Sequence, residues 1–201
     1  MKKLALSFYN RKDVVKIARD LLGKIVVTNF DGKITSGKIV ETEAYVGIID
    51  KASHAFSGKR TARNEHMYAS AGTAYVYICY GMHQMLNIVT NQKEIPDAVL
   101  IRSIEPVNGI EIMMERTGKK ISDKTITRGP GNVGKSLGIY KHHSGLNLLD
   151  EEIYLLDNEE IIPDEQIGVS KRIGVESAGA DALLPYRFFV KGNKYVSGKN
   201  S

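Results

Sequence analysis

The sequence predicts a single domain of the mixed α/β (α+β) class over residues 1–201. A chain of 201 residues, 42% of them hydrophobic, is long enough to bury one sizeable core. Two tight-turn signals, Asp31-Gly32 and Gly81, each separate two strand-like runs, which indicates antiparallel hairpins. An apolar stripe at helical spacing near the N-terminus adds the first helix. No repeat, low-complexity tract or domain linker interrupts this pattern.

The first half of the chain is expected to place a strand with two carboxylates in a hairpin. Its expected elements, in order, are a helix over 11–22 capped by Asn10 and ended by Gly23, a strand over 24–30, a type I′ turn at Asp31-Gly32, a strand through Tyr45, and a polar loop region over 45–71. Loops of that length are usually functional or disordered.

The second half is expected to add a hairpin with its tip at Tyr80, Gly81 and Met82. Its expected elements are strands over 73–80, 84–90 and 98–104, a helix from Pro106 to about Arg116 stopped by Gly118, a short helix within 129–139, a strand over 153–156, a tight turn at 173–175, and strands over 186–191 and 195–197. Arg102 is the one charge inside an apolar strand, so it needs a partner.

Composition indicates a soluble intracellular protein, placed in the cytoplasm or nucleoid. Twenty-eight Lys and Arg against 23 Asp and Glu give a net charge of +5, which suits an anionic partner without requiring one. Cys79 is the single cysteine, can form no internal disulfide, and is expected to be buried in its apolar run. The N-terminal apolar run is too short for a signal peptide, and no stretch approaches a membrane span.

Side-chain alternation concentrates reactive groups between Ile39 and Asn87. In a strand over 39–45, Glu41, Glu43 and Tyr45 share one face. In the strand over 73–80, Tyr75, Tyr77 and Cys79 share one face, and Tyr80 points away from them. The two strands therefore offer carboxylates and aromatic rings to one site.

The run Gly129-Pro-Gly-Asn-Val-Gly-Lys-Ser136 matches the phosphate-binding loop of nucleotide triphosphatases. That chemistry needs a buried parallel strand directly before the loop and a long helix after it. A polar run over 119–128 precedes it instead, and Gly138 follows soon after. Pro130 also removes one backbone N–H from a loop that works by donating them. The hypothesis that the chain is a nucleotide triphosphatase is therefore weak.

The ordered set of motifs resembles the alkyladenine type of 3-methyladenine DNA glycosylase, the methylpurine DNA glycosylase family. The motifs are Glu-Thr-Glu-Ala-Tyr (41–45), His54, Arg63-Asn64, Gly72 through Met82, Asn87, Leu100-Ile-Arg102, Glu105-Pro106, Gly129-Pro-Gly, Ile173-Gly-Val and Arg187-Phe-Phe-Val190. The resemblance implies a curved, mainly antiparallel sheet with peripheral helices and a protruding β-hairpin. It also implies hydrolysis of the N-glycosidic bond of alkylated or deaminated purines in duplex DNA, without metal, cofactor or covalent intermediate.

The resemblance assigns the chemistry to Glu43 and Arg102. Glu43 is expected to activate the water that attacks the sugar C1′, and Arg102 to help hold that water and the flipped nucleotide. Ile173 aligns with a position that supplies a backbone carbonyl to the same water. Each residue also has an alternative without a catalytic role. Glu43 could be a solvated strand glutamate, for which Glu41 is the internal control, and Arg102 could form an ion pair with a carboxylate.

The resemblance also assigns a base pocket. Tyr45 and Tyr77 are expected as its walls and His54 as its closing side, although a lone histidine is more often structural. A base alkylated at a ring nitrogen is cationic and gains about 0.5–2 kcal/mol over a desolvated aromatic face. Asn87 is expected to obstruct the 2-amino group of guanine. The alternative for Asn87 is a strand asparagine bonded to backbone.

Binding of double-stranded DNA that contains damaged purines is expected at the hairpin and the basic loop. Extrusion of a nucleotide leaves a gap that Tyr80 is expected to fill from the minor groove, although periodicity alone favours a core tyrosine. The residues expected at the DNA surface are Lys59, Arg60, Thr61, Arg63, Met67, Met82 and His83. His83 and Lys59 depart from the tyrosine and arginine common in the family, which leaves local contacts open.

The leading hypothesis is a monofunctional glycosylase that acts as a monomer on 3-methyladenine, 7-methylguanine, hypoxanthine or ethenoadenine, in no order that the sequence ranks. A different class remains open: a lesion- or shape-sensing DNA-binding module without chemistry, against which only the intact Glu43 argues. A lyase with a lysine Schiff base is disfavoured because no lysine lies in the core motifs.

Overall fold

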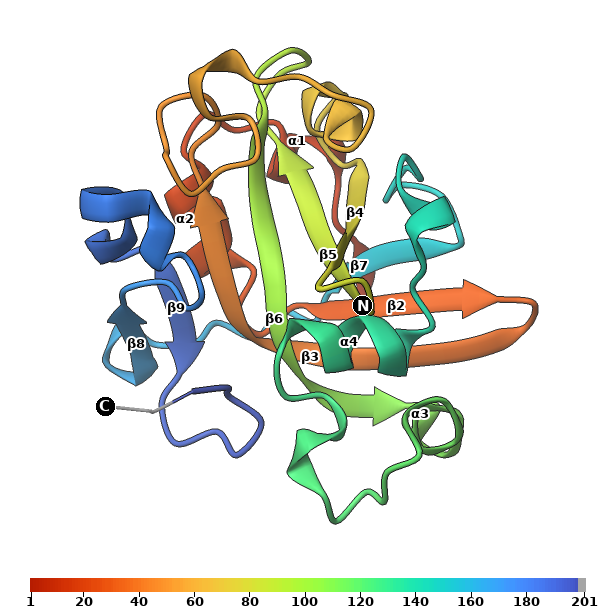
Figure 1. Ribbon diagram of the computed structural model, residues 1–201. Helices are drawn as coiled ribbons and strands as arrows, with labels where there is room; N and C mark the ends of the chain where they lie inside the picture. Colours follow the sequence, from red (N-terminus) through yellow and green to blue (C-terminus); the bar gives the residue numbers. More distant parts are fainter. Residues whose placement is uncertain (199–201) are drawn as a thin grey trace.

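The computed structural model describes residues 1–198 and contains a nine-stranded, antiparallel, open sheet (Figure 1). The strand order along the sheet is β1-β7-β2-β3-β6-β5-β4, with β9 on β3 and β8 on β9. The strands are β1 Lys2–Lys3, β2 Ile25–Phe30, β3 Lys33–Tyr45, β4 Ala74–Cys79, β5 His83–Thr90, β6 Asp97–Asn108, β7 Ile153–Asp157, β8 Ile167–Ser170 and β9 Arg187–Val190. The predicted mixed α/β class with a mainly antiparallel sheet is confirmed.

Both predicted hairpins form; two residues connect β2 to β3 and three connect β4 to β5, and each connection begins with two residues at positive φ. Asp31 and Gly32 have φ of 53° and 75°, and Tyr80 and Gly81 have φ of 50° and 72°. Two consecutive positive φ angles define the type I′ turn, whose twist matches that of the flanking strands. The second turn therefore holds a bulky tyrosine in the left-handed region, where such residues are rarely found.

Strand β3 is the centre of the sheet because it pairs with three neighbours. Its first half pairs with β2, its second half pairs with β9 from Glu41 to Glu43, and its other edge pairs with β6. The β3–β6 register shifts between Ile39 and Glu41 and again between Glu41 and Thr42. Local irregularities of this kind re-aim side chains. Strand β6 bends along its length, so that the β2–β3 hairpin crosses the direction of β5 (Figure 1).

The α-helices cover the sheet but begin and end differently from the predictions. Their bounds are α1 Leu6–Tyr9, α2 Val14–Asp20, α3 Ile110–Thr117 and α4 Pro130–Leu137. Asp13, not Asn10, caps α2, because its side chain accepts the Lys16 N–H at 2.9 Å. The helix predicted from Pro106 starts only at Ile110, because β6 continues to Asn108 and Gly109, with φ 71°, turns the chain.

Smaller elements lie at the ends and in the loops. The 3₁₀ helices are Phe56–Gly58, Glu65–Tyr68, Lys124–Ile126, Lys141–His143, Asp164–Gln166 and Glu176–Leu183. The prediction missed β1 and β8, which are two and four residues long. The predicted strand over 195–197 is wrong: those residues form no ladder, and Val196 N–H closes a turn onto the Asn193 carbonyl.

The glycine-rich segment that resembles a phosphate loop packs a helix instead. A 3₁₀ turn precedes it rather than a strand, and α4 is only eight residues long. A Cβ on Gly134 would lie 2.0 Å from the Gln84 carbonyl oxygen, and one on Gly131 would lie 2.6 Å from the His83 ring. Ser136 is buried and donates to the Val133 carbonyl. The glycines therefore allow α4 to approach β5 closely, and the phosphate-loop reading is wrong.

The long polar loop between β3 and β4 is held by its own small core. The core consists of Ala55, Met67, Tyr68, Tyr75, Val89 and Ala98, with Tyr77 packed beside it. Asn64 is buried and ties the loop together: its side chain accepts from Thr61 and donates to the carbonyls of His54 and Lys59. The loop is thereby fixed over the β4–β5 end of the sheet. Across residues 1–198, no helix has the length and apolar character needed to cross a membrane.

Candidate active site

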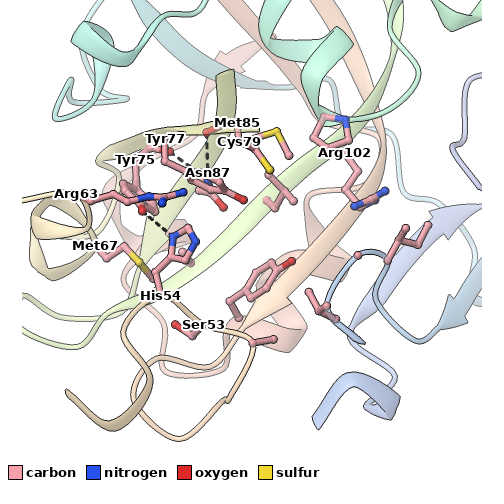
Figure 2. Close-up of a pocket in the computed structure, with 18 of the residues that line it drawn as sticks. Ser53, His54, Arg63, Met67, Tyr75, Tyr77, Cys79, Met85, Asn87 and Arg102 are labelled. Carbon is pink, nitrogen blue, oxygen red and sulfur yellow. Dashed lines mark hydrogen bonds between the residues drawn. The ribbon is translucent and has the colours of Figure 1, made fainter. Parts of the chain in front are cut away.

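A pocket of about 500 Å³ lies between the long loop, the β4–β5 hairpin and the turn at 173–175 (Figure 2). That volume falls in the range typical of small-ligand sites, about 300–1,000 Å³. Its lining includes Tyr45, His54, Tyr77, Asn87 and Arg102. Five predicted site residues from five separate segments thus meet at one cavity.

Glu43 lies directly behind this lining and is fully buried. Its Oε2 accepts the hydroxyl of Tyr45 at 2.9 Å, and its Oε1 accepts the backbone N–H of Ile173 at 2.8 Å. Arg102 Nη1 lies 3.2 Å from Oε1. All three partners line the pocket, so the carboxylate is one side chain away from it. The Ile173 contact uses the N–H, whereas the predicted contribution was its carbonyl.

Burial raises the pKa of Glu43 above the ordinary glutamate value, because an ionised carboxylate loses its hydration there. Attraction to Arg102 and the hydrogen bonds from Ile173 and Tyr45 oppose the rise, and repulsion by Glu41 adds to it. Burial also raises the pKa of Tyr45, which stays a hydroxyl donor. A base with a raised pKa accepts a proton more readily at neutral pH than an ordinary glutamate does.

Glu41 was expected to be an ordinary solvated glutamate, and that expectation is wrong. It is 0% exposed and is surrounded by donors. These are Arg102 Nε at 3.0 Å, Arg187 Nε at 2.7 Å, Ser103 Oγ at 2.6 Å, Ser197 N–H at 2.8 Å and Ser197 Oγ at 2.9 Å. Burial alone raises the pKa of Glu41, but the two guanidinium groups and the hydroxyl and amide donors outweigh it and lower the pKa overall.

Arg102, on β6, bridges the carboxylates of Glu41 and Glu43 on β3. Its guanidinium contacts Glu41 through Nε and Glu43 through Nη1. The position of Arg102 is therefore compatible with both expectations, an ion pair with a carboxylate and a place beside the proposed site. Burial disfavours its charge, yet Glu43 and Glu41 together raise its pKa, and the guanidinium stays cationic. We call Glu41, Glu43, Arg102 and Arg187 the buried ionic cluster; with every member ionised it is electrically neutral.

A second buried ion pair supports the pocket from behind. Arg172 and Asp50 are both buried and bonded through two nitrogen–oxygen pairs. The Arg172 guanidinium lies 4.8 Å from the ring centroid of Tyr45 and donates to the Ala44 carbonyl at 2.9 Å. Because Arg172 precedes Ile173 in the chain, its anchoring also holds the N–H that Glu43 accepts.

His54 stands edge-on against Tyr77, with ring centroids 4.5 Å apart (Figure 2). Its Nδ1 lies 2.8 Å from the hydroxyl of Tyr75. Burial and the positive charges of Arg63 and Lys59 lower the pKa of His54 to about 4. The imidazole is therefore neutral at physiological pH, and Tyr75 orients it.

Asn87 is buried and lines the pocket opposite β4. Its Nδ2 donates to the carbonyls of Tyr75 at 3.3 Å and Met85 at 3.2 Å. Both expected readings of Asn87 are thus compatible with its position. Cys79, expected to be buried, is only half-buried and lines the pocket, because the β4 face that it shares with Tyr75 and Tyr77 is turned to the cavity rather than to the core.

Of the side chains predicted at the DNA surface, Arg63 and Tyr80 line the pocket, and all but Met67 are exposed; we call these exposed residues the exposed rim. Tyr80 is 85% exposed and Met82 69%, and Lys59, Thr61, Arg63 and His83 are exposed as well. Arg63 lies 5.4 Å from the Tyr77 ring centroid. Met67 is instead buried in the loop core and lines the pocket. Arg60 is exposed but is engaged by Glu65 and Glu94.

The structure brings to the site several residues to which the sequence assigned no role there: Glu41, Asp50, Tyr75, Arg172, Arg187 and Ser197. The signal for Tyr75 was present, because it shares the period-two face of Tyr77. The other contacts join positions more than 60 residues apart, which no local pattern reveals. In residues 1–198, no group of three His, Cys, Asp or Glu side chains is arranged to hold a metal ion.

Comparison with known proteins agrees with the motifs. Residues 7–194 match the family model described as Methylpurine-DNA glycosylase (MPG). A relative from Clostridium perfringens is 46% identical over 98% of this chain and 100% of its own. Relatives from Clostridium acetobutylicum and Bacillus subtilis are 42% and 39% identical, over 97% and 96% of both chains. Each of the three carries the name "Putative 3-methyladenine DNA glycosylase".

The fold, the aromatic pocket and these matches define the class of this enzyme: a DNA glycosylase, a hydrolase of base excision repair. Within that class, the chain belongs to the methylpurine-DNA glycosylase family. The resemblance inferred from the motifs is confirmed.

Proposed function

We propose that this protein is a monofunctional glycosylase that removes alkylated or deaminated purines from duplex DNA and leaves an abasic site. Its substrates are 3-methyladenine, 7-methylguanine, hypoxanthine and ethenoadenine, and the whole chain acts as one domain and as a monomer, without a metal. One observation carries the proposal: the buried carboxylate of Glu43 shares hydrogen bonds with Tyr45 and Ile173, both of which line the aromatic pocket.

Glu43 acts as the general base in this proposal. A carboxylate has about four acceptor positions, and Tyr45, Ile173 and Arg102 take three of those on Glu43. The fourth accepts a water, which Glu43 deprotonates as it attacks the sugar C1′. The negative charge of Glu43 also favours the positive charge that develops on the sugar, and this attraction is strong because the site is buried.

The pocket selects the base by charge and shape. Tyr45 and Tyr77 present aromatic faces to a flat ring, and a cationic alkylated purine gains about 0.5–2 kcal/mol from such a face. His54 stays neutral at physiological pH, so it does not repel that cation. Asn87, held by two backbone carbonyls, disfavours the 2-amino group of guanine; undamaged guanine is thereby rejected, whereas the cationic ring of 7-methylguanine offsets this penalty by its attraction to the aromatic faces.

Tyr80 fills the gap that the extruded nucleotide leaves. Flipping a base costs a few kcal/mol of stacking and pairing, which a wedge between base steps helps to offset. Tyr80 suits that task because it projects from a turn, is 85% exposed and is held at φ 50°. Arg63, Lys59, Thr61 and His83 lie on the same exposed rim and contact DNA without reading its sequence.

The test is base release and DNA binding measured on the same lesion-bearing duplex. Glu43→Gln keeps size and hydrogen bonding but removes the base, so we expect single-turnover release to fall by at least about 10²-fold while binding is retained. Glu111→Gln, an exposed glutamate on α3, serves as the matched control. Undiminished release by Glu43→Gln contradicts the assignment of the base. Binding by the parent without any release identifies the lesion-sensing module instead, and borohydride trapping of a covalent adduct identifies a lyase.

A further inference from the structure

Glu41 is a buried charge that the proposed reaction does not use. It does not line the pocket, and its five donor contacts come from Arg102, Ser103, Arg187 and Ser197. A carboxylate so enclosed has no route to a substrate. Its contacts nevertheless converge on the one cation, Arg102, that also touches Glu43.

The guanidinium of Arg102 is fixed on two of its three nitrogens. Nε donates to Glu41 at 3.0 Å, and Nη2 donates to Ser197 Oγ at 3.2 Å. A guanidinium is planar and rigid, so fixing two nitrogens also fixes the third. The third, Nη1, is the atom that lies 3.2 Å from Glu43. Ser197 Oγ in turn donates to Glu41 at 2.9 Å, which closes a ring of contacts around Arg102.

The segment that carries Ser197 is itself anchored to the cluster. Arg187 Nη2 donates to the Ser197 carbonyl at 2.6 Å, and Ser197 N–H donates to Glu41 at 2.8 Å. Ser197 lies beyond the stretch matched by the family model, which ends at residue 194.

We propose that Glu41 and Ser197 are positioning residues that lock Arg102 against Glu43, so that the catalytic carboxylate is held at one place beside the pocket. The inference rests on the function proposed above. Misplacement of a reacting group by about 1 Å can cost about 10²-fold in rate. The lock therefore affects the chemical step rather than DNA binding, since neither residue lies on the exposed rim.

The test is the single-turnover rate of base release as a function of pH, on the lesion that the parent releases fastest. Glu41→Gln is expected to lower the rate at pH 7 by about 10- to 100-fold and to move the acidic limb of the profile to lower pH. The limb moves because Glu43 loses a neighbouring like charge. The remaining groups that face Glu43 are Tyr45, Tyr77, Arg102, Arg172 and, opposite in register, Arg187.

Ser197 supplies a second and milder variant. Ser197→Ala keeps every charge of the cluster, so we expect the rate to fall by about tenfold with the acidic limb in its original place. Ser197→Thr restores the hydroxyl and is expected to restore the rate. Asp97→Asn is the matched control, because Asp97 is another buried carboxylate of the sheet, hydrogen-bonded to Asn91 at 2.9 Å, and should retain the parent profile.

The outcomes separate this inference from the proposed function. Folding is checked by circular dichroism, and DNA affinity by fluorescence anisotropy with the same duplex. A folded Glu41→Gln with the parent rate and profile overturns the lock. Should Glu41→Gln fail to fold, a parent rate in Ser197→Ala overturns it instead. If Glu43→Gln is inactive while both other variants are fully active, only the lock is wrong; if Glu43→Gln is active, the proposed function itself is wrong.

Discussion

The two ends of the buried ionic cluster differ in acid–base behaviour although their carboxylates are two residues apart on one strand. Glu41 and Glu43 are both 0% exposed, and both contact Arg102. The pKa of Glu41 is lowered, however, and that of Glu43 is raised. Burial raises both pKa values, but it is opposed more strongly at Glu41, which has five donor contacts and two guanidinium groups, than at Glu43, which has three contacts and one such group.

The comparison teaches how one strand can hold two buried carboxylates whose pKa values shift in opposite directions, as a structural carboxylate and the proposed general base require. At the Glu41 end the ionised form is fully compensated, so it adds stability. At the Glu43 end compensation is incomplete, so the carboxylate favours taking up a proton, as a general base must. Incomplete compensation at a reactive group is a common form of the conflict between stability and activity.

Removal of each charge in turn should break the comparison most visibly. Glu41→Gln leaves Arg187 without its buried carboxylate and Arg102 with Glu43 as its only carboxylate partner, and we expect a loss of about 3 kcal/mol or more in unfolding free energy at pH 7. Glu43→Gln removes a charge that burial disfavours, so its stability should equal or exceed that of the parent. Urea unfolding of both variants measures the difference; equal losses would show that the two ends are alike.

The sign of the pH dependence follows from the two directions of shift. Glu41, with a lowered folded-state pKa, contributes stability above its unfolded pKa, and that contribution is lost as pH falls through the folded value. Glu43, with a raised pKa, contributes stability only below its unfolded value and loses it as pH rises through the folded value. On acidification the parent loses the stabilising contribution of ionised Glu41, and Glu41→Gln has no such contribution to lose. We therefore expect the unfolding free energy of the parent to fall relative to that of Glu41→Gln as the pH is lowered, which urea unfolding at several pH values measures.

Activity should sharpen the same comparison at the Glu43 end. Because ionised Glu43 is the proposed base, release should fall on acidification, with its limb above the ordinary glutamate pKa of 4.5. Tyr45→Phe removes a hydrogen bond that lowers the pKa of Glu43, so it should move the limb to higher pH. This shift is opposite to that expected for Glu41→Gln. A pH–rate profile of single-turnover release measures both, and shifts in one common direction would contradict the account.

The hairpin tip provides a test outside the cluster. Tyr80→Asn removes the wedge and places at φ 50° a residue that tolerates the left-handed region. We expect the rate of base release to fall by roughly tenfold or more, because the wedge no longer offsets the free energy needed to flip the base. The unfolding free energy should stay unchanged or rise by about 0.5 kcal/mol. Kinetics on duplex and on single-stranded DNA locate the defect, because a wedge matters little where no base pair is opened.

The smallest effect is expected at the basic loop, where two arginines differ in their partners. Arg63→Ala should weaken DNA binding and reduce the salt slope by about one, as for a single phosphate contact. Arg60→Ala should change affinity less than twofold, because Glu65 and Glu94 already engage that side chain at 2.6 and 2.5 Å. Anisotropy titrations at several salt concentrations compare them. A larger effect for Arg60 would show that its ion pairs open on DNA binding.

The parts of the fold predicted from sequence are those set by local geometry. Asp31-Gly32 and Tyr80-Gly81 specify their turns, and the turns set the registers of two hairpins. The helix predicted from Pro106 to about Arg116 forms as α3 and ends at Gly118 as predicted, but its predicted start was wrong, because a proline near the end of a strand carries the same local signal as one at the start of a helix. The bend of β6 that keeps Pro106 in a ladder opposite Gly37 depends on contacts 69 residues apart.

Within the site, Tyr45 and Tyr77 line one cavity with Glu43 directly behind it, as the side-chain alternation predicted, but the burial of Glu41 was not predicted. An acidic residue on a strand face is usually solvated, and nothing near Glu41 in the chain shows that Arg187 and Ser197 fold over it. Met67 was expected at the DNA surface from the family resemblance, but it is buried in a loop core that is built from residues distant in the sequence.

The slip in pairing between β3 and β6 has a consequence for engineering the chain. The pairing offset between the two strands is the same at Lys38–Glu105 and at Glu43–Leu100. Between these pairs, at Glu41–Ser103, it differs by one residue. Two opposite slips, at Val40 and at Arg102, thus cancel. Deleting Val40 alone would leave a net slip and turn the following side chains to the wrong face of the sheet. Grafts of β3 into another scaffold must therefore carry the facing segment of β6 with it.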